Sequence, residues 1–537
     1  MNIAGYEYKN MVLACIGILF LIRLGVGYYA SRQVSSAIDF IVAGRRLPIY
    51  LAGASIMATW FAAEVLMGAS SNAYQYGMQG VVFDPFGAAL CLFISGFFFI
   101  RLMRRARYLT LIDFFERRFG KTMGFLISLV QLVTYFGWTA AQIVAGGNIV
   151  HALFGWPVSV GMVVVALIVT IYTMMGGMWA DTLLDFMQMF LTATGITIVF
   201  AAVLSAVGGW DMLIANGGSM FTSDAFTLLP IPGEGYLGYD GMLGWTYWLA
   251  AWMAVGLGSI AAQDLMQRSM AARNEATSVH GTYLAAILYL FFGVMSPLIG
   301  IAMFAINPNL AVEQTEFILV SAAMQYLAPI LTSLFIAALA SALMSTSDTS
   351  MLAGASIVSE NMLPFLGVKL GEKGQLLATR LGVLGMGVAS LLIALYAETI
   401  YKLAVFSWTV LLVGVFTSFA FGMYWKKANV VGAVVAFISG FASWLILIFY
   451  VLLPITIVVC EGDYEVAIWD AAYMGSVPAL IISIIGMVVG SAVSQKKYAP
   501  LPLRDVDGNI MEFKNLLGIN PIWDAIRKLK PGEENTT

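Results

Sequence analysis

Residues 53–74 read GASIMATWFAAEVLMGASSNAY. The stretch is apolar enough to lie in a membrane, yet small residues flank a Thr-Trp pair and a carboxylate, Glu64. An ionisable side chain at membrane depth costs about 2.5 to 3.5 kcal/mol unless it finds a partner. A second stretch, residues 245–268, reads WTYWLAAWMAVGLGSIAAQDLMQR, with Gly256 and Gly258 about midway. We expect both helices to be interrupted near the middle of the bilayer, although the two glycines are also compatible with close helix packing alone.

The composition of the 537-residue chain indicates an integral membrane protein. Hydrophobic residues make up 60% of it and charged residues 11%, and apolar runs of about 18 or more residues recur along the sequence. These values exclude the soluble, disordered and disulfide-rich secreted classes. A formal charge of -3 indicates no nucleic-acid partner. The three cysteines, Cys15, Cys91 and Cys460, lie in or beside different runs, which argues against a disulfide framework or a CxxC metal site.

The apolar runs predict thirteen transmembrane spans, the first of which we interpret as a retained helix. They lie at 11–30, 48–72, 80–102, 122–153, 157–176, 182–207, 242–267, 278–306, 329–361, 375–396, 400–424, 430–455 and 473–494. With the N-terminus outside, all but three of the 27 Lys and Arg fall on the cytoplasmic side, the exceptions being Lys9, Arg23 and Lys402. This asymmetry predicts a cytoplasmic C-terminus.

Each of the two interrupted spans begins a block of five spans. Because five is odd, the second block must cross the membrane in the opposite sense, which gives a five-plus-five inverted repeat typical of secondary transporters. We therefore expect an all-α membrane protein with the following parts: 1–47, an outside segment, the first helix and a cytoplasmic loop; 48–207, the first repeat; 208–241, an extracellular loop; 242–425, the second repeat; 426–495, two further helices; and 496–537, a cytoplasmic tail.

A hydroxyl-rich run in the ninth span, SALMSTSDTS at residues 341–350, is difficult to explain by packing. Isolated Ser and Thr in membrane helices usually bond to their own backbone, which accounts for two or three of these residues. At helical spacing, Ser345, Asp348 and Thr349 share one face. Together with Asp185 in the sixth span, they offer oxygen ligands that suit a small hard cation.

Two further acids, Asp84 and Asp264, are expected near span ends, where solvation by water accounts for them. The sequence contains no phosphate-binding glycine loop, which disfavours pumping driven by ATP.

Several segments together resemble the sodium:solute symporter family, which includes carriers of proline, pantothenate, sugar, sialic acid and choline. The similar segments are DFIVAGRRLPIYLAGASIMATW after the first span, YLTLIDFFERRFG after the third, YTMMGGMWADTLLDFMQ at the fifth and sixth, QDLMQR at the end of the seventh, and ALASALMSTSDTSMLAGASIVSENM in the ninth. They run across most of residues 38–427. The resemblance implies thirteen spans with an outside N-terminus, a five-plus-five core of the LeuT type, and sodium as the coupling ion.

The resemblance also implies the ligands of a shared sodium site. Matched position by position, these are the backbone carbonyls of Ala58, Phe61 and Ala342 with the hydroxyls of Ser345 and Thr346. A second sodium ion, bound in some members, would use the side chains of Asp185, Ser345, Asp348 and Thr349. The family often has Trp-Thr-Asp before the glutamine of the sixth span, whereas here two leucines precede Asp185, so the surroundings of the second site differ.

The local similarity is closest to the high-affinity choline carriers, in which aromatic faces hold a quaternary ammonium by cation-π attraction. The candidate solute-binding residues are aromatic, amide or acidic side chains of the interrupted spans and their neighbours: Trp60, Glu64, Tyr135, Trp138, Gln142, Trp252, Gln263 and Trp408. One tryptophan of those carriers corresponds here to Ala262. Membrane tryptophans also anchor at interfaces, and a buried Glu64 is equally compatible with hydrogen bonding to nearby backbone.

The sequence therefore predicts a sodium-coupled importer of a small organic cation or zwitterion such as choline, betaine, an amine or an amino acid. One or two sodium ions are expected, with no catalytic activity and no obligatory protein partner, in a bacterial or archaeal inner membrane. A membrane nutrient sensor of the same fold, or a sodium-coupled carrier of a sugar or carboxylate, is the alternative. A passive channel is disfavoured because the chain lacks a pore-lining repeat.

Overall fold

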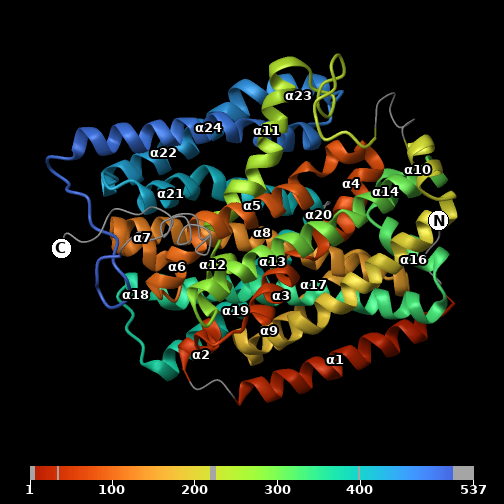
Figure 1. Ribbon diagram of the computed structural model, residues 1–537, viewed down its shortest axis with the longest axis horizontal. Helices are drawn as coiled ribbons and strands as arrows, with labels where there is room; N and C mark the ends of the chain where they lie inside the picture. Colours follow the sequence, from red (N-terminus) through yellow and green to blue (C-terminus); the bar gives the residue numbers. More distant parts are fainter. Residues whose placement is uncertain (1–6, 33–35, 218–224, 397–399, 512–537) are drawn as a thin grey trace, which may run out of the picture.

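The computed structural model describes residues 7–32, 36–217, 225–396 and 400–511 (Figure 1). These residues fold into a bundle of helices joined by short connections. The α-helices are α1 (Lys9–Ser31), α2 (Ala37–Val42), α3 (Ile49–Trp60), α4 (Ala69–Tyr76), α5 (Ala88–Ile94), α6 (Ile100–Ala106), α7 (Ile112–Phe119), α8 (Lys121–Phe154), α9 (Val158–Val207), α10 (Trp210–Gly217), α11 (Gly241–Gly258), α12 (Gln263–Ala271), α13 (Glu275–Gly293), α14 (Met295–Ile306), α15 (Val312–Thr315), α16 (Ile318–Tyr326), α17 (Pro329–Ile357), α18 (Leu363–Phe365), α19 (Glu372–Ala394), α20 (Ile400–Leu411), α21 (Thr417–Tyr424), α22 (Val430–Ile446), α23 (Leu453–Val459) and α24 (Tyr464–Ser494).

The predicted count of thirteen spans is not confirmed. Within the described residues, ten helices are long and apolar enough to cross a membrane, or eleven if the bent pair α11 and α12 forms one span. Two shorter apolar helices, Ile49–Trp60 and Val158–Ile171, lie in the predicted spans 48–72 and 157–176. One span is lost from the count because span 48–72 is broken and its second part continues into the next apolar run, Glu64–Ala106; the other is lost because the apolar helix in span 157–176 ends at Ile171 and is too short to cross alone.

The first interruption lies where the sequence predicts it. Helix α3 ends at Trp60, Phe61 has non-helical angles (φ -87, ψ 66), and a short π-helical segment (Glu64–Gly68) follows. The second interruption lies at Ala262, which is extended (φ -91, ψ 138), and α11 and α12 meet there at a 50° bend. Gly258, inside the helix, has a different role, because a Cβ there would clash with the carbonyl oxygen of Trp408.

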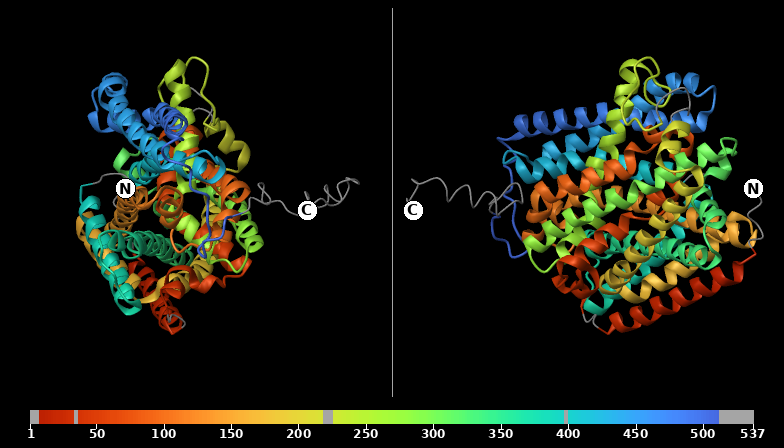
Figure 2. Two further views of the ribbon diagram at one scale, coloured as in Figure 1. Left: turned by 90° about the vertical axis from the view of Figure 1, so that its left-hand side faces the viewer. Right: turned by 45° about the vertical axis from the view of Figure 1, so that its right-hand side comes forward.

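The two interrupted helices run in opposite directions. Leu47, just before α3, pairs with the end of α12: its N–H donates to the Ala271 carbonyl (3.1 Å) and its carbonyl accepts from the Arg273 N–H (2.9 Å). The start of one interrupted helix therefore lies beside the end of the other, as an inverted repeat requires. Figures 1 and 2 show α3 and α17 inside the bundle, with α1 along one side and α22 and α24 along another.

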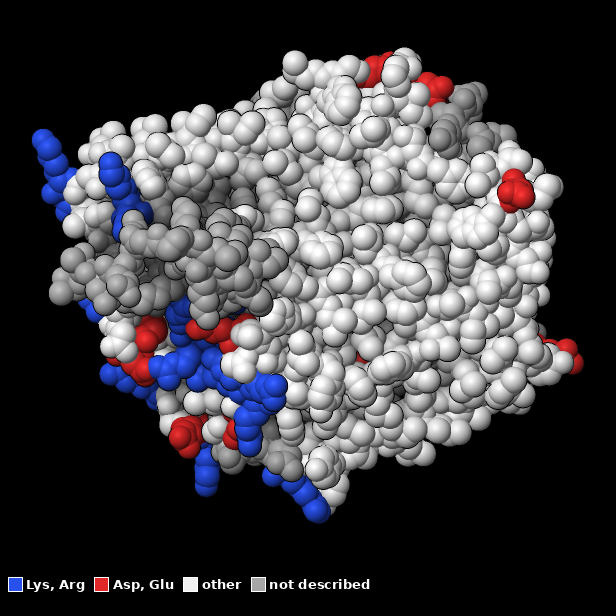
Figure 3. Space-filling model, viewed as in Figure 1, with Lys and Arg blue, Asp and Glu red and all other residues white. Residues whose placement is uncertain are grey.

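Charged side chains are unevenly distributed over the surface. On the face drawn in Figure 3, Lys and Arg gather at the end where Figure 1 has α2, α6 and α7, and a broad uncharged belt follows. At this end, Glu275 accepts hydrogen bonds from Arg105 through both carboxylate oxygens, at 2.9 and 2.8 Å. An uncharged belt between polar ends is the surface that a bilayer requires.

Candidate sodium and solute site

The break in α3 exposes backbone carbonyls toward neighbouring helices. A helix leaves its last four carbonyls without intrahelical donors, and three of the four have a hydrogen-bond donor here. The Met57 carbonyl accepts from the Phe61 N–H (2.9 Å), the Thr59 carbonyl from the Thr346 hydroxyl of α17 (2.7 Å), and the Trp60 carbonyl from the Tyr289 hydroxyl of α13 (3.1 Å). The break therefore joins α3 to both α13 and α17.

The two helices that carry the residues predicted for the shared sodium site, α3 and α17, are in contact at this break. Thr346 binds the last turn of α3, in which Ala58 lies, and Phe61 follows directly. Ser345 and Ala342 precede Thr346 on α17, and both are buried. Hydroxyl and carbonyl oxygens at the junction of two helices are the hard donors that sodium prefers. The donor set present here therefore fits a sodium ion.

Asp185 of α9 is bound from three sides. Its Oδ1 accepts from the Ser345 hydroxyl and its Oδ2 from the Ser55 hydroxyl of α3 at 2.6 Å. The Arg268 guanidinium of α12 lies 3.4 Å from the same Oδ2 and 2.5 Å from Asp181 Oδ2, and it also donates to Ser55 at 3.0 Å. All of these side chains are buried. Arg268 therefore supplies a positive charge at the predicted second sodium site.

Asp348 does not join Asp185, contrary to the predicted ligand set. Its carboxylate forms an ion pair with Arg23 of α1 (2.8 Å) and accepts from the Thr173 hydroxyl (2.5 Å). Thr349 instead donates to Asp181 (3.1 Å). The reason is geometric: at about 100° per residue, positions three and four beyond Ser345 lie on opposite sides of it, so the two side chains face different neighbours.

The buried ion pairs leave one charge uncompensated. Three carboxylates, Asp181, Asp185 and Asp348, face two guanidinium groups, Arg23 and Arg268. If all five are ionised, the cluster has one excess negative charge. One monovalent cation would neutralise it, and a buried charge needs such compensation.

Beyond the break, Glu64 lies among neutral hydrogen-bond donors. Its Oε1 accepts from Trp138 Nε1 at 2.7 Å and its Oε2 from Gln142 Nε2 at 2.8 Å, both on α8. Gln142 also accepts from the Ala63 N–H at 3.2 Å, which fixes the chain beside the break. Within the described residues, Glu64 forms no ion pair.

Asp264 has a matching environment on the other side of the aromatic residues. Its Oδ2 accepts from Trp60 Nε1 and its Oδ1 from the Tyr135 hydroxyl, each at 2.8 Å. The Trp408 ring contacts both tryptophans that donate to the two acids, with centroids 5.9 Å from Trp60 and 4.8 Å from Trp138. Three tryptophans therefore connect the two buried carboxylates.

The expectation that Asp84 and Asp264 are solvated near span ends is wrong. Asp84 is 3% exposed and Asp264 is 0% exposed, and Asp84 accepts from the Tyr289 hydroxyl at 2.7 Å. Both acids lie beside helix interruptions, where the chain turns within the protein interior. The sequence marks an apolar run but does not show where a broken helix brings its polar residues back into the core.

Two predicted solute-binding residues lie apart from this aromatic cluster. Gln263 is bonded to the loop before α7, because its Oε1 accepts from the Leu111 N–H at 2.6 Å. Trp252 contacts Phe86 and Trp248, with centroids 6.4 and 6.3 Å away. The cluster beside the break thus contains Trp60, Glu64, Tyr135, Trp138, Gln142 and Trp408 of the predicted set, with Asp264 added.

Sequence reasoning missed four members of the sodium region: Arg23, Ser55, Asp181 and Arg268. A signal was present for Arg23, since an arginine inside an apolar run needs a buried partner. Asp181 lies one helical turn before Asp185, and Arg268 ends the segment QDLMQR. The pair joins α9 to α12, and its two members are 87 residues apart in the sequence.

Comparisons with known proteins agree with this architecture. The model of the Sodium:solute symporter family matches residues 40–440. The chain is 26% identical to the high affinity choline transporter 1 of Homo sapiens over 457 residues, which cover 80% of this chain and 75% of that protein. It is 25% identical to the osmoregulated proline transporter OpuE of Bacillus subtilis (strain 168), over 90% of this chain and 95% of the relative.

Solved structures share the fold. A Na+-coupled sialic acid symporter in a substrate-bound outward-open state aligns with a TM-score of 0.75 at 20% identity, covering 92% of this chain and 99% of that one. MhsT in complex with L-phenylalanine aligns with a TM-score of 0.50 at 11% identity, over 85% of this chain and 99% of that chain. The expected all-α membrane fold of the LeuT type is confirmed.

Proposed function

The chain belongs to the sodium:solute symporter family, and we propose that it uses the sodium gradient to import a small organic cation or zwitterion. Its relatives carry choline, proline and pantothenate by name, which supports an organic solute. We place the protein in a bacterial or archaeal inner membrane with its N-terminus outside and its C-terminus in the cytoplasm. The basic end in Figure 3 would then face the cytoplasm. Its activity is transport, without chemical conversion of the solute.

The observation that carries this proposal is the environment of Glu64. A buried carboxylate that is bonded only to neutral donors lacks a counter-charge, and an ammonium group of the solute would supply one. The rings of Trp60, Trp138 and Trp408 offer the faces that attract such a cation. A sugar or a dicarboxylate has no cationic centre to match this arrangement.

We propose that one sodium ion binds between α3 and α17. Its ligands are the carbonyls of Ala58, Phe61 and Ala342 and the hydroxyls of Ser345 and Thr346. We propose no second ion at Asp185, because Arg268 already contacts this carboxylate. The first ion, bound by Ser345 beside Asp185, would itself offset the excess negative charge of the cluster. Uptake should therefore depend hyperbolically on the sodium concentration, whereas a sigmoidal dependence would require two ions.

Coupling follows from the position of the ion at the junction of two helices. Sodium would hold the end of α3 against α17 and so favour the arrangement that receives solute. Each ion that enters carries about 2.3 kcal/mol for every 100 mV of inside-negative potential, in addition to its concentration gradient. This energy is sufficient to accumulate solute tens-fold, because each 1.4 kcal/mol is a factor of about ten.

A thermal-shift screen of the purified protein tests the proposal. Amines, betaines, amino acids, sugars and carboxylates would each be added in sodium chloride and in potassium chloride. We expect the stabilising compounds to carry an ammonium group and to act more strongly in sodium. Equal stabilisation in both salts would contradict sodium coupling, and stabilisation by sugars or dicarboxylates alone would contradict the solute class.

Flux measurements then separate a carrier from a sensor. Proteoliposomes containing the protein would be loaded with potassium and diluted into sodium with the radiolabelled compound. A carrier accumulates the compound and loses the accumulation when a sodium ionophore is added. Binding without accumulation would favour the nutrient sensor.

A further inference from the structure

Two buried polar side chains of α9 form no hydrogen bond within the described part of the chain. They are Gln188, at both its amide oxygen and its amide nitrogen, and Thr192, at its hydroxyl. Gln188 is 4% exposed and Thr192 is 1% exposed. An unsatisfied buried polar group costs about 1 to 3 kcal/mol. Such side chains therefore indicate a polar ligand that protein atoms do not provide.

These residues continue the row of acids that binds Arg268. Asp181, Asp185, Gln188 and Thr192 follow one another at helical spacing and so lie on one face of α9. We call them the polar stripe of α9. Its first two members are bonded to α3, α12 and α17. Gln188 and Thr192 extend the stripe by two turns in the direction of the chain.

The register between α9 and α17 places Gln188 opposite Ala342. Thr349 contacts Asp181 and Ser345 contacts Asp185. The two helices are therefore antiparallel, and moving four residues forward along α9 corresponds to moving four residues back along α17. Gly195, ten residues after Asp185, lies against the ring of Phe335, ten residues before Ser345. The register is therefore the same at this point. Interpolation between the last two contacts brings Gln188 to the level of Ala342.

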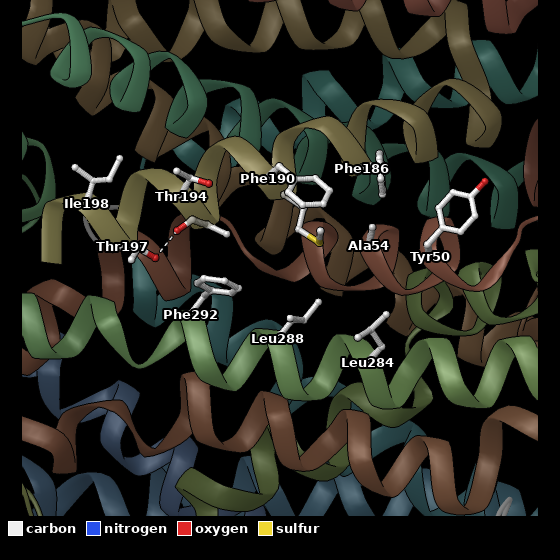
Figure 4. Close-up of a pocket in the computed structure, with 12 residues that line it drawn as sticks. Tyr50, Ala54, Phe186, Phe190, Thr194, Thr197, Ile198, Leu284, Leu288 and Phe292 are labelled. Carbon is white, nitrogen blue, oxygen red and sulfur yellow. Dashed lines mark hydrogen bonds between the residues drawn. The ribbon is translucent and has the colours of Figure 1, made fainter. Parts of the chain in front are cut away.

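The register between α9 and α3 places Gln188 near Ala58. Figure 4 shows the two helices running side by side in the same direction, with Tyr50 and Ala54 on α3 and the series from Phe186 to Ile198 on α9. These residues line an apolar groove of about 510 Å³. On the inner side of the same two helices, Ser55 binds Asp185 at 2.6 Å. Three residues further along each helix lie Ala58 and Gln188.

We propose that the amide oxygen of Gln188 is a further ligand of the sodium ion between α3 and α17. An amide oxygen is a hard donor of the kind that binds alkali and alkaline-earth cations. Gln188 lies at the level of two predicted carbonyl ligands, Ala58 and Ala342. It belongs to α9, which packs against α3 and α17 but supplies no ligand in the predicted set for this ion. Thr192, one turn further, holds water of the ion's hydration shell. This inference rests on the proposed sodium site.

Gln188→Met tests the inference through sodium binding in the absence of solute. The readout is the sodium concentration that gives half-maximal thermal stabilisation, with potassium replacing sodium at constant ionic strength. We expect this concentration to rise at least tenfold. In potassium alone the variant should melt at the same temperature as the unchanged protein or higher, because the substitution removes an unsatisfied amide. Gln188→Glu should act in the opposite direction and lower the sodium concentration needed, since it adds a negative charge to the ion.

Two comparison variants make the outcome decisive. Thr182→Val removes a buried hydroxyl of the same helix that already bonds its own backbone, at the Met178 carbonyl (2.8 Å), and should leave sodium binding unchanged. Thr346→Ala removes a predicted ligand and should weaken it. If Thr346→Ala weakens sodium binding and Gln188→Met does not, the inference is overturned while the sodium site stands. If neither variant does, the sodium site itself is wrong and the inference falls with it.

Discussion

Replacing Glu64 with glutamine removes the charge from the solute site and keeps its shape. A carboxylate and an ammonium about 4 Å apart attract each other by about 4 kcal/mol at an effective dielectric constant of about 20. Desolvation of the ammonium offsets part of this attraction, and the tryptophan faces remain. We therefore expect solute binding to weaken by about 1.4 to 3 kcal/mol, which is roughly 10- to 150-fold.

The substitution also has a small structural cost. Glu64 accepts hydrogen bonds at both oxygens, from Trp138 and Gln142, whereas a glutamine has one oxygen and would present its amide group to the other donor. The loss of one hydrogen bond should reduce the free energy of unfolding by about 1 kcal/mol. The folded variant should therefore remain available for binding measurements.

The assay is solute binding at saturating sodium, together with sodium binding without solute, both followed by thermal shift. Glu64→Gln should weaken the first and leave the second within about twofold. Asp470→Asn is the matched control, because Asp470 is a half-buried acid of α24 bonded to two neutral hydroxyls, Tyr239 at 2.9 Å and Tyr247 at 2.7 Å. Full retention of solute affinity in Glu64→Gln, or an equal loss of both affinities, would refute the proposed ammonium partner.

Three further substitutions test other contacts of the site. Thr346→Ala should raise the sodium concentration for half-maximal uptake at least tenfold, with Thr346→Ser close to normal, because serine keeps the hydroxyl; unchanged sodium dependence would exclude this ligand. Arg23→Met should destabilise the protein by about 3 to 5 kcal/mol by leaving Asp348 unpaired, and adding Asp348→Asn should restore much of the lost stability. Thermal unfolding of the single and double variants measures this, and no recovery in the double variant would mean that the unpaired carboxylate does not cause the destabilisation. Trp408→Leu should weaken solute binding by about 0.5 to 2 kcal/mol without changing sodium binding, and unchanged solute affinity in a binding assay would place the ring outside the site.

The first helix interruption could be predicted from the sequence because its signal is local. Small residues around Trp60 and an acid at position 64 disfavour a continuous apolar helix, and the structure breaks α3 directly after Trp60. The second interruption was predicted near Gly256 and Gly258 but lies at Ala262. A glycine in a membrane helix indicates either a break or the close approach of another helix. Position 258 is glycine because the backbone of Trp408 leaves no room there for a side chain.

The ion pairs could not be predicted, because they join segments far apart in the chain. Arg23 meets Asp348 across 325 residues, and helical spacing alone does not show which neighbouring helix each side of α17 faces. The residue type shows that a buried arginine needs an acidic partner, but it does not show which of the buried acids that partner is. The same uncertainty applies to Asp181, whose proximity to Asp185 suggests repulsion until Arg268 is placed between them.

The arrangement of α3 explains how two sites for different ligands can be coupled without a long pathway. On one side of the break, Ser55 binds Asp185 and the Thr59 carbonyl binds α17. On the other side, Glu64 binds two side chains of α8. A change in the angle at the break would alter both sets of contacts. If sodium and solute both bind best at the same angle, the binding of either one strengthens the binding of the other. Linkage then requires the effect of sodium on solute affinity to equal the effect of solute on sodium affinity.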